Sequence, residues 1–297
     1  MAGFVVEKAA LKGAAFLFRL LRAGEGIHRL LVVSVLVGLS GCASVDRFGG
    51  SRQAVVEWGR QQGFEASHLR LDGFRLLSLQ RSDASRRSEI LNVYIEGDGA
   101  AWQTPFHPPR DPTPLQPTAL ALAAADPAPA VAYLGRPCQY LDAAELAACS
   151  PEYWTNSRFA PEVVAAYMAF LDRLKETSGA RSLRLVGYSG GGVLATLLAV
   201  RRNDVERLVT VASPLAVAEW TAWHQATPLP GSLDPAADVK RPLPPATHFV
   251  GGRDSVVPPQ VVAPFAARSG GRLREVPEFD HQCCWSRDWP RLLEEVK

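Results

Sequence analysis

A serine flanked by glycines separates a strand-like run from a helix-like run in the second half of the chain. The apolar run 183–186 leads into segment 187–191, which has Ser189 at its centre, and the helix-forming stretch 193–200 follows. A serine on a sharp turn from strand to helix needs glycine neighbours, because a Cβ there would collide with the strand or the helix. The pattern predicts a turn that projects the Ser189 hydroxyl above the end of a sheet, as expected of a nucleophile.

Two downstream residues have the chemistry that a serine nucleophile requires. The strand-like run 247–251 leads into a loop with Asp254, and a second run at 273–276 is followed by His281. Histidine is the usual base for a serine, and a carboxylate holds the imidazole in the correct tautomer. The sequence therefore predicts a catalytic triad of Ser189, Asp254 and His281, in a chain order that separates it from triads on other folds.

Neighbours of His281 offer competing interpretations. Asp280 is adjacent to it, but adjacent side chains on an extended chain point to opposite sides. Cys283 and Cys284 follow it closely and suggest a cysteine nucleophile. Structural cysteines are the commoner case, so we expect these two to contribute to stability rather than to chemistry.

An upstream glycine-rich turn predicts a site for a developing negative charge. The β-rich run 90–95 enters segment 96–102, whose backbone N–H groups can point at an oxyanion. With this fourth element the chain resembles the α/β-hydrolase superfamily. The resemblance implies that the backbone N–H groups of Asp98 and Gly190 form the oxyanion hole. The superfamily usually has His-Gly-x in this loop, and this chain has Glu96 at the histidine position, which leaves the backbone role intact.

The resemblance covers residues 69–297 and implies an α/β fold with a mostly parallel central sheet and helices on both faces. We expect this domain to span 52–297, with a hairpin at 68–80 on one edge of the sheet and an irregular segment at 220–239. No spacing of cysteine and histidine suits zinc, and no phosphate-binding or dinucleotide motif occurs. Neither a metal nor a cofactor is predicted.

The residues before this domain have the pattern of an export signal. A basic region precedes the apolar run 30–39, which is too short to span a membrane and ends in small residues. Residues 39–42, Leu-Ser-Gly-Cys, resemble a bacterial lipobox. The resemblance implies a signal peptide over 1–41 and a lipidated Cys42, which a short tether to residue 51 joins to the domain. It also implies attachment to the outer membrane, facing the periplasm, because Ala43 stands where an aspartate would signal retention at the inner membrane. An ordinary cleaved signal or an uncleaved anchor is the alternative.

Charge and cysteine content agree with an exported protein. The chain carries a formal charge of +2, and its first 41 residues hold five basic and two acidic side chains, a net charge of +3. The remaining residues therefore carry a net charge of −1, which indicates no nucleic-acid partner. Export implies an oxidising compartment. Cys138 and Cys149 flank a short segment and are expected to form a disulfide, whereas Cys283 and Cys284 are either a vicinal disulfide or free thiols.

These observations predict a carboxylesterase-like serine hydrolase that acts on a small-molecule acyl substrate and attaches to the membrane through Cys42. Ester hydrolysis ranks first because it is the commonest chemistry of this arrangement, a ranking that rests on analogy between folds. The alternative is a non-catalytic envelope lipoprotein that uses the hydrolase fold as a binding module.

Overall fold

The computed structural model describes residues 48–71, 73–86, 88–100 and 107–296. The chain from residue 47 onward forms one compact unit. The expected signal segment 1–41 and the expected lipidation site Cys42 lie outside the described residues. No helix in the described ranges has both the length and the apolar character needed to cross a membrane.

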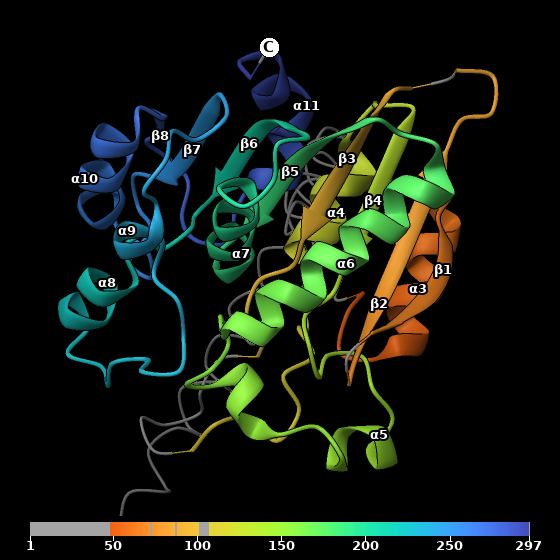
Figure 1. The fold of residues 1–297 in the computed structure, drawn as a ribbon, viewed down its shortest axis with the longest axis horizontal. Coiled ribbons are helices and arrows are strands. Elements are labelled where there is room, and N and C mark those ends of the chain that lie inside the picture. The colour runs from red at the N-terminus through yellow and green to blue at the C-terminus, as the bar shows by residue number, and fades with distance from the viewer. Residues whose placement is uncertain (1–47, 72, 87, 101–106, 297) are drawn as a thin grey trace, which may run out of the picture. The chain divides into compact units, whose positions relative to one another are not determined.

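An eight-stranded sheet forms the centre of this unit (Figure 1), with strand order β1-β2-β4-β3-β5-β6-β7-β8. The strands are β1 (Glu65–Leu71), β2 (Phe74–Ser82), β3 (Ile90–Ile95), β4 (Ala130–Leu134), β5 (Ser182–Tyr188), β6 (Val205–Val211), β7 (Ala246–Gly251) and β8 (Arg272–Val276). β2 runs antiparallel to both of its neighbours, and the other pairs are parallel. The mostly parallel sheet with a hairpin at one edge was predicted from the sequence and is confirmed.

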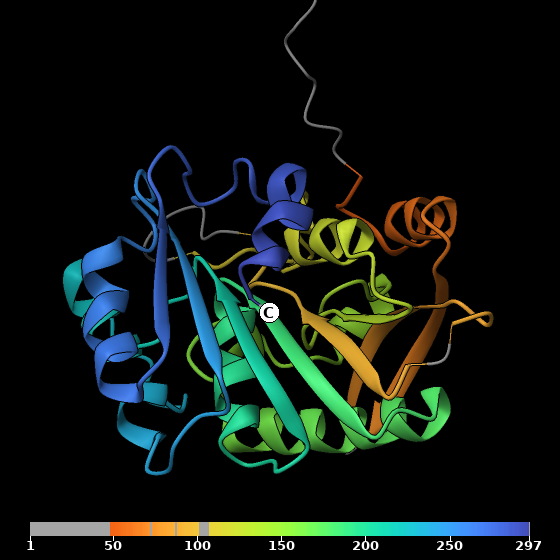
Figure 2. The ribbon, with the colours of Figure 1, turned by 90° about the horizontal axis from the view of Figure 1, so that it is seen from above.

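Helices cover both faces of the sheet (Figure 2). They are α3 (Arg52–Gln61), α4 (Thr118–Ala125), α5 (Ala143–Ala147), α6 (Pro161–Ser178), α7 (Gly190–Ala199), α8 (Val217–Trp223), α9 (Pro235–Asp238), α10 (Pro259–Ser269) and α11 (Trp285–Glu294), with a 3-10 turn η1 (Pro151–Trp154). α6 and α7 pack on one face, and α3, α4 and α11 pack on the other. The segment expected to be irregular at 220–239 contains the end of α8 and all of α9.

Alternation along the strands divides the apolar core between the two faces. In β3, Val93 and Ile95 join the cluster with α6 and α7, whereas Tyr94 between them joins the cluster with α4 and α11. Successive side chains of a strand point to opposite faces, so a sheet covered on both sides needs apolar residues at nearly every position. This explains the mostly apolar runs that the sequence shows at the central strands.

The parallel arrangement collects the candidate residues at one edge of the sheet. The carboxyl ends of parallel strands meet at the same edge, where ligands usually bind in α/β folds. Asp98 follows β3, Ser189 follows β5, Asp254 follows β7 and His281 follows β8. Four segments that lie far apart in the sequence therefore meet above one edge of the sheet.

A disulfide joins Cys138 and Cys149 in the segment that follows β4, with Cα atoms 5.8 Å apart. Closing a loop of this length restricts the unfolded chain and stabilises a domain by about 3 kcal/mol. Cys283 and Cys284 are also joined by a disulfide, so neither sulfur is a free thiolate.

Candidate active site

Ser189 occupies a strained turn between β5 and α7. Its backbone has φ 50° and ψ −126°, a region that side-chain-bearing residues seldom adopt and that often marks functional sites. A Cβ on Gly187 would collide with the backbone of Gly191, and a Cβ on Gly191 would collide with the backbone at the end of β3. The glycines around Ser189 are therefore required by packing, as the sequence pattern indicated.

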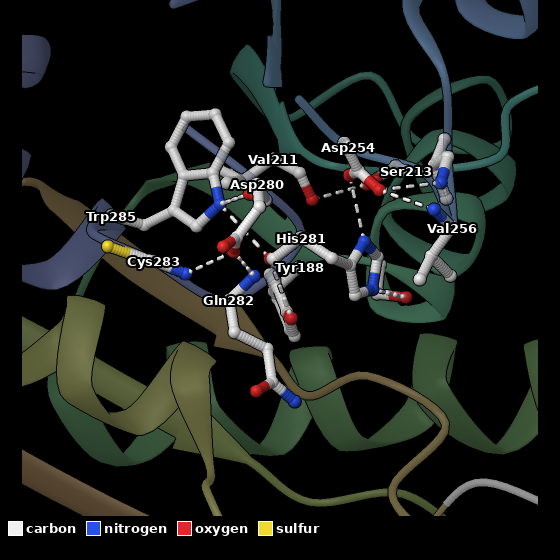
Figure 3. A network of polar contacts seen from close by, with 12 residues as sticks. Tyr188, Val211, Ser213, Asp254, Val256, Asp280, His281, Gln282, Cys283 and Trp285 are labelled. Atoms are coloured by element: carbon white, nitrogen blue, oxygen red, sulfur yellow. Dashed lines mark hydrogen bonds and ion pairs between the residues drawn. The ribbon is translucent and has the colours of Figure 1, made fainter. Parts of the chain in front are cut away.

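The imidazole of His281 lies between Ser189 and Asp254. The distance from His281 Nε2 to Ser189 Oγ is 3.1 Å. The distance from His281 Nδ1 to Asp254 Oδ2 is 2.9 Å, and Figure 3 shows this pair. A carboxylate only accepts hydrogen bonds, so Nδ1–H donates to Asp254 and Nε2 accepts from the serine hydroxyl. The structure thus places the three predicted triad residues in one hydrogen-bonded chain.

Backbone N–H groups in the loop after β7 orient the Asp254 carboxylate. The side chain of Asp254 is fully buried. Its Oδ1 accepts hydrogen bonds from the backbone N–H groups of Val256 at 2.8 Å and Val257 at 2.7 Å. These bonds fix the second oxygen, Oδ2, toward His281. Asp254 is therefore a fixed carboxylate partner for the imidazole, as expected from the sequence.

The loop that carries His281 is held by its own Asp280 and by two aromatic side chains from outside the loop. Asp280 Oδ1 accepts hydrogen bonds from the backbone N–H groups of Gln282 at 2.8 Å and Cys283 at 2.7 Å, so its carboxylate closes a turn (Figure 3). The hydroxyl of Tyr188 and the indole N–H of Trp285 donate to the carbonyl of His281, at 3.0 Å and 3.1 Å. Asp280 therefore positions the loop, and Asp254 rather than Asp280 binds the imidazole.

The loop after β3 brings Asp98 beside the start of α7. A Cβ on Gly190 would collide with the Asp98 carboxylate, so the two residues are neighbours across the turn. Among the described residues, no acceptor binds the backbone N–H of Asp98 or of Gly190, whereas Gly97 N–H donates to Glu96 Oε1 at 2.9 Å. Two backbone donors that bind no acceptor among the described residues, near a candidate nucleophile, are what an oxyanion hole requires.

Two arginines hold the carboxylate of Asp98. Arg136 Nη1 donates to Asp98 Oδ1 and Arg158 Nη1 donates to Asp98 Oδ2, both at 2.8 Å. Burial opposes ionisation of Asp98, but the charges and hydrogen bonds of Arg158 and Arg136 outweigh it and lower the pKa of the Asp98 carboxyl. Both guanidinium groups are buried, with 3% and 10% of the side chains of Arg136 and Arg158 exposed. We call Asp98, Arg136 and Arg158 the arginine clamp.

Glu96 links the same loop to α4. Its side chain is buried, and Oε1 accepts hydrogen bonds from the backbone N–H groups of Gly97 at 2.9 Å and Ala119 at 3.3 Å. Burial raises the pKa of the Glu96 carboxyl from 4.5 to about 7, against the opposing effect of these hydrogen bonds. Glu96 therefore ties the glycine-rich turn to the first turn of a helix.

Replacement of Glu96 by glutamine is expected to change how stability depends on pH. The unfolded-state pKa lies near 4.5 and the folded-state pKa near 7, so the stabilising contribution is complete below pH 4.5 and is lost as the pH rises through 7. Relative to Glu96→Gln, the wild type should lose roughly 3 kcal/mol of unfolding free energy over this interval. Urea unfolding at several pH values measures the difference. The exposed Glu206→Gln is the control, and a parallel pH dependence in wild type and Glu96→Gln would contradict this assignment.

Known structures share this fold at low sequence identity. Est1E from Butyrivibrio proteoclasticus superposes with a TM-score of 0.52 at 14% identity, over 78% of this chain and 98% of that one. An α/β serine hydrolase homologue from Coxiella burnetii gives 0.52 at 13% identity, over 78% and 95%. The esterase Pf2001 of Pyrococcus furiosus gives 0.54 at 12% identity, over 80% and 93%. Neither a protein-family model nor a curated protein matches the chain. The chain has the α/β-hydrolase fold, which esterases and serine hydrolases share.

Proposed function

We propose that this protein is a serine hydrolase that cleaves an acyl ester through Ser189, His281 and Asp254. The hydrogen-bonded chain from Ser189 Oγ to the buried Asp254 carboxylate, with the serine on a strained turn, is the observation that carries the proposal. The fold shared with esterases supports it.

The geometry suits acyl transfer in two steps. His281 Nε2 accepts the proton of Ser189 as Oγ attacks the carbonyl carbon, and Asp254 stabilises the imidazolium that forms. The N–H groups of Asp98 and Gly190 hold the oxyanion, each worth about 3 kcal/mol of transition-state stabilisation. His281 then protonates the departing alcohol, which leaves an acyl group on Ser189. A water molecule, deprotonated by His281, releases the acid and restores the enzyme.

The lipobox pattern supports a further part of the same proposal. Cys42 carries the lipid, and the tether that follows it holds the hydrolase domain at the outer membrane on the periplasmic side. The support is the sequence alone, because Cys42 lies outside the described residues.

Labelling with a fluorophosphonate tests the hydrolase function. The probe reacts only with an activated serine, so the wild type should be labelled and Ser189→Ala should not. Ser178→Ala, at an exposed serine on α6, is the matched control and should keep full labelling. A folded wild type that stays unlabelled and does not cleave a short activated ester would instead favour the non-catalytic binding module.

A further inference from the structure

Large apolar side chains are exposed at one edge of the sheet. Among the described residues they are Leu115, Trp223 and Val256, with 57%, 56% and 42% of their surface exposed. Leu115 lies between β3 and α4, Trp223 ends α8 after β6, and Val256 lies between β7 and α10. Single exposed apolar residues are common, but all three lie on segments that follow the carboxyl ends of strands. We call these three residues the apolar rim.

One side of the rim is bonded to the acid loop of the triad. The backbone N–H of Val256 donates to Asp254 Oδ1 at 2.8 Å. The carbonyl of Val256 accepts hydrogen bonds from Trp220 Nε1 at 2.7 Å and from His224 Nε2 at 2.8 Å. These bonds fix the end of α8, and with it Trp223, beside the loop that holds the Asp254 carboxylate.

The other side of the rim borders a cavity next to the histidine loop. This cavity has a volume of about 1190 Å³, and Leu115 lines it together with Gly99 and Gln282. Gly99 follows Asp98 directly and Gln282 follows His281 directly. The apolar rim therefore reaches the active-site loops at two places, through Val256 at the Asp254 loop and through Leu115 at the cavity that Gln282 also lines.

The chain enters the domain at this same edge. Gly49 N–H donates to the carbonyl of Leu115 at 3.2 Å, and Gly50 N–H donates to the carbonyl of Pro114 at 2.8 Å. Gly50 also lines the cavity. Cys42 precedes Gly50 by eight residues, and eight residues reach at most about 29 Å when fully extended. A compact unit of this size is about 46 Å wide. A lipid on Cys42 would therefore hold this edge, and not the opposite one, against a membrane.

We propose that the apolar rim docks on the lipid bilayer that holds the Cys42 anchor, and that the substrate is an acyl ester resident in that bilayer. This inference rests on the proposed hydrolase function and on lipidation of Cys42. Tryptophan suits the boundary between water and lipid, because its ring is apolar and its N–H is polar. Apolar side chains that enter this boundary add to the affinity of a lipid anchor. An ester in the bilayer then reaches the cavity that Gly99 and Gln282, the neighbours of Asp98 and His281, help to line, without leaving the lipid surface.

The test compares two esters presented to the full-length protein. Lipidated wild type and the double variant Leu115→Ser with Trp223→Ser are reconstituted into vesicles of phosphatidylethanolamine and phosphatidylglycerol. One ester is a fluorogenic long-chain oleate dissolved in the vesicles, and the other is a water-soluble butyrate of the same fluorophore. The ratio of oleate to butyrate turnover should fall by about tenfold in the double variant, because the rim no longer enters the lipid.

A second measurement separates docking from turnover. In the full-length Cys42→Ser background, co-sedimentation with the same vesicles reports binding through the rim alone. The double variant should bind about tenfold more weakly than Cys42→Ser itself. Glu206→Gln combined with Ala267→Gln is the control for both measurements, because both residues are exposed and lie toward the opposite edge, near the starts of β6 and β8.

The outcomes distinguish this inference from the proposed function. If the wild type cleaves neither ester, the hydrolase function fails and the inference fails with it. If the butyrate is cleaved and neither the turnover ratio nor vesicle binding responds to the rim variant, the inference alone is overturned. A rim variant that converts a dimer into a monomer without changing the ratio would assign the surface to a second copy of this chain. A full-length protein in which Cys42 carries no lipid would also overturn the inference.

Discussion

Replacing both Ser189 and His281 with alanine is expected to lower the hydrolysis of a short activated ester by about 10⁴-fold or more, no further than either single replacement. The two side chains act in one step, because His281 Nε2 removes the proton of the Ser189 hydroxyl that lies 3.1 Å away. A triad that lacks either member has lost that step, so the two effects do not add. Asp254→Asn should be impaired to a similar degree, about 10⁴-fold, because an amide donor stabilises the wrong tautomer of His281. Steady-state kinetics of the single and double variants measure these effects.

Cys283→Ser is the informative control for the nucleophile. The sulfur of Cys283 is bonded to that of Cys284, so its replacement should affect stability more than turnover. If Ser189→Ala kept its activity and Cys283→Ser lost it, the nucleophile would have been assigned to the wrong residue. If the double variant of Ser189 and His281 were far less active than either single variant, the two residues would act independently.

The sequence was most informative for residues that lie just after the end of a strand. Each central strand is an apolar run that ends at the same edge of the sheet, so the residues just after β5, β7 and β8 could be assigned to one place. The positions of Ser189, Asp254 and His281 just after these strands are enough to predict that the three residues lie together. The order of these three residues along the chain, together with the glycines at the turn, also predicted the α/β-hydrolase fold.

Contacts between loops that lie far apart along the chain produce no recognisable pattern in the sequence. Arg136 and Arg158 lie 38 and 60 residues from Asp98, and both lie outside strands and helices. An arginine in a loop is usually solvated, so the burial of Arg136 and Arg158 against the partly buried Asp98 carboxylate becomes visible only in the folded chain. The only local signal was the place of Arg136, which follows β4 at the edge where the active-site loops meet. The short helices α8 and α9 were missed for a related reason, because at four to seven residues they show no helical period.

The arginine clamp gives the second large expected effect. Asp98→Asn removes the negative charge that both guanidinium groups bind at 2.8 Å, and leaves two buried cations without a counter-ion. Loss of one partner from a buried ion pair costs about 3–5 kcal/mol of unfolding free energy. The clamp also holds the loop whose Asp98 N–H is proposed to bind the oxyanion, and loss of one oxyanion donor lowers kcat by about 10²-fold or more. Urea unfolding and ester kinetics of the same variant measure both quantities.

Replacing Asp172, another aspartate that binds an arginine, is the control for Asp98→Asn. Asp172 also accepts a hydrogen bond from an arginine, Arg202, at 2.7 Å, but 63% of its side chain is exposed. The Asp172 carboxylate is exposed and Arg202 keeps a second partner, Asp204, at 2.6 Å, so Asp172→Asn should change stability by less than about 1 kcal/mol and kcat not at all. Within the clamp, Arg158→Lys keeps the charge but lacks the planar fork, and should lower kcat more than it lowers stability. If Asp98→Asn unfolded at the same urea concentration as the wild type and kept its kcat, the clamp would have no part in positioning the oxyanion loop. A fall in stability with kcat unchanged would restrict the clamp to a structural role.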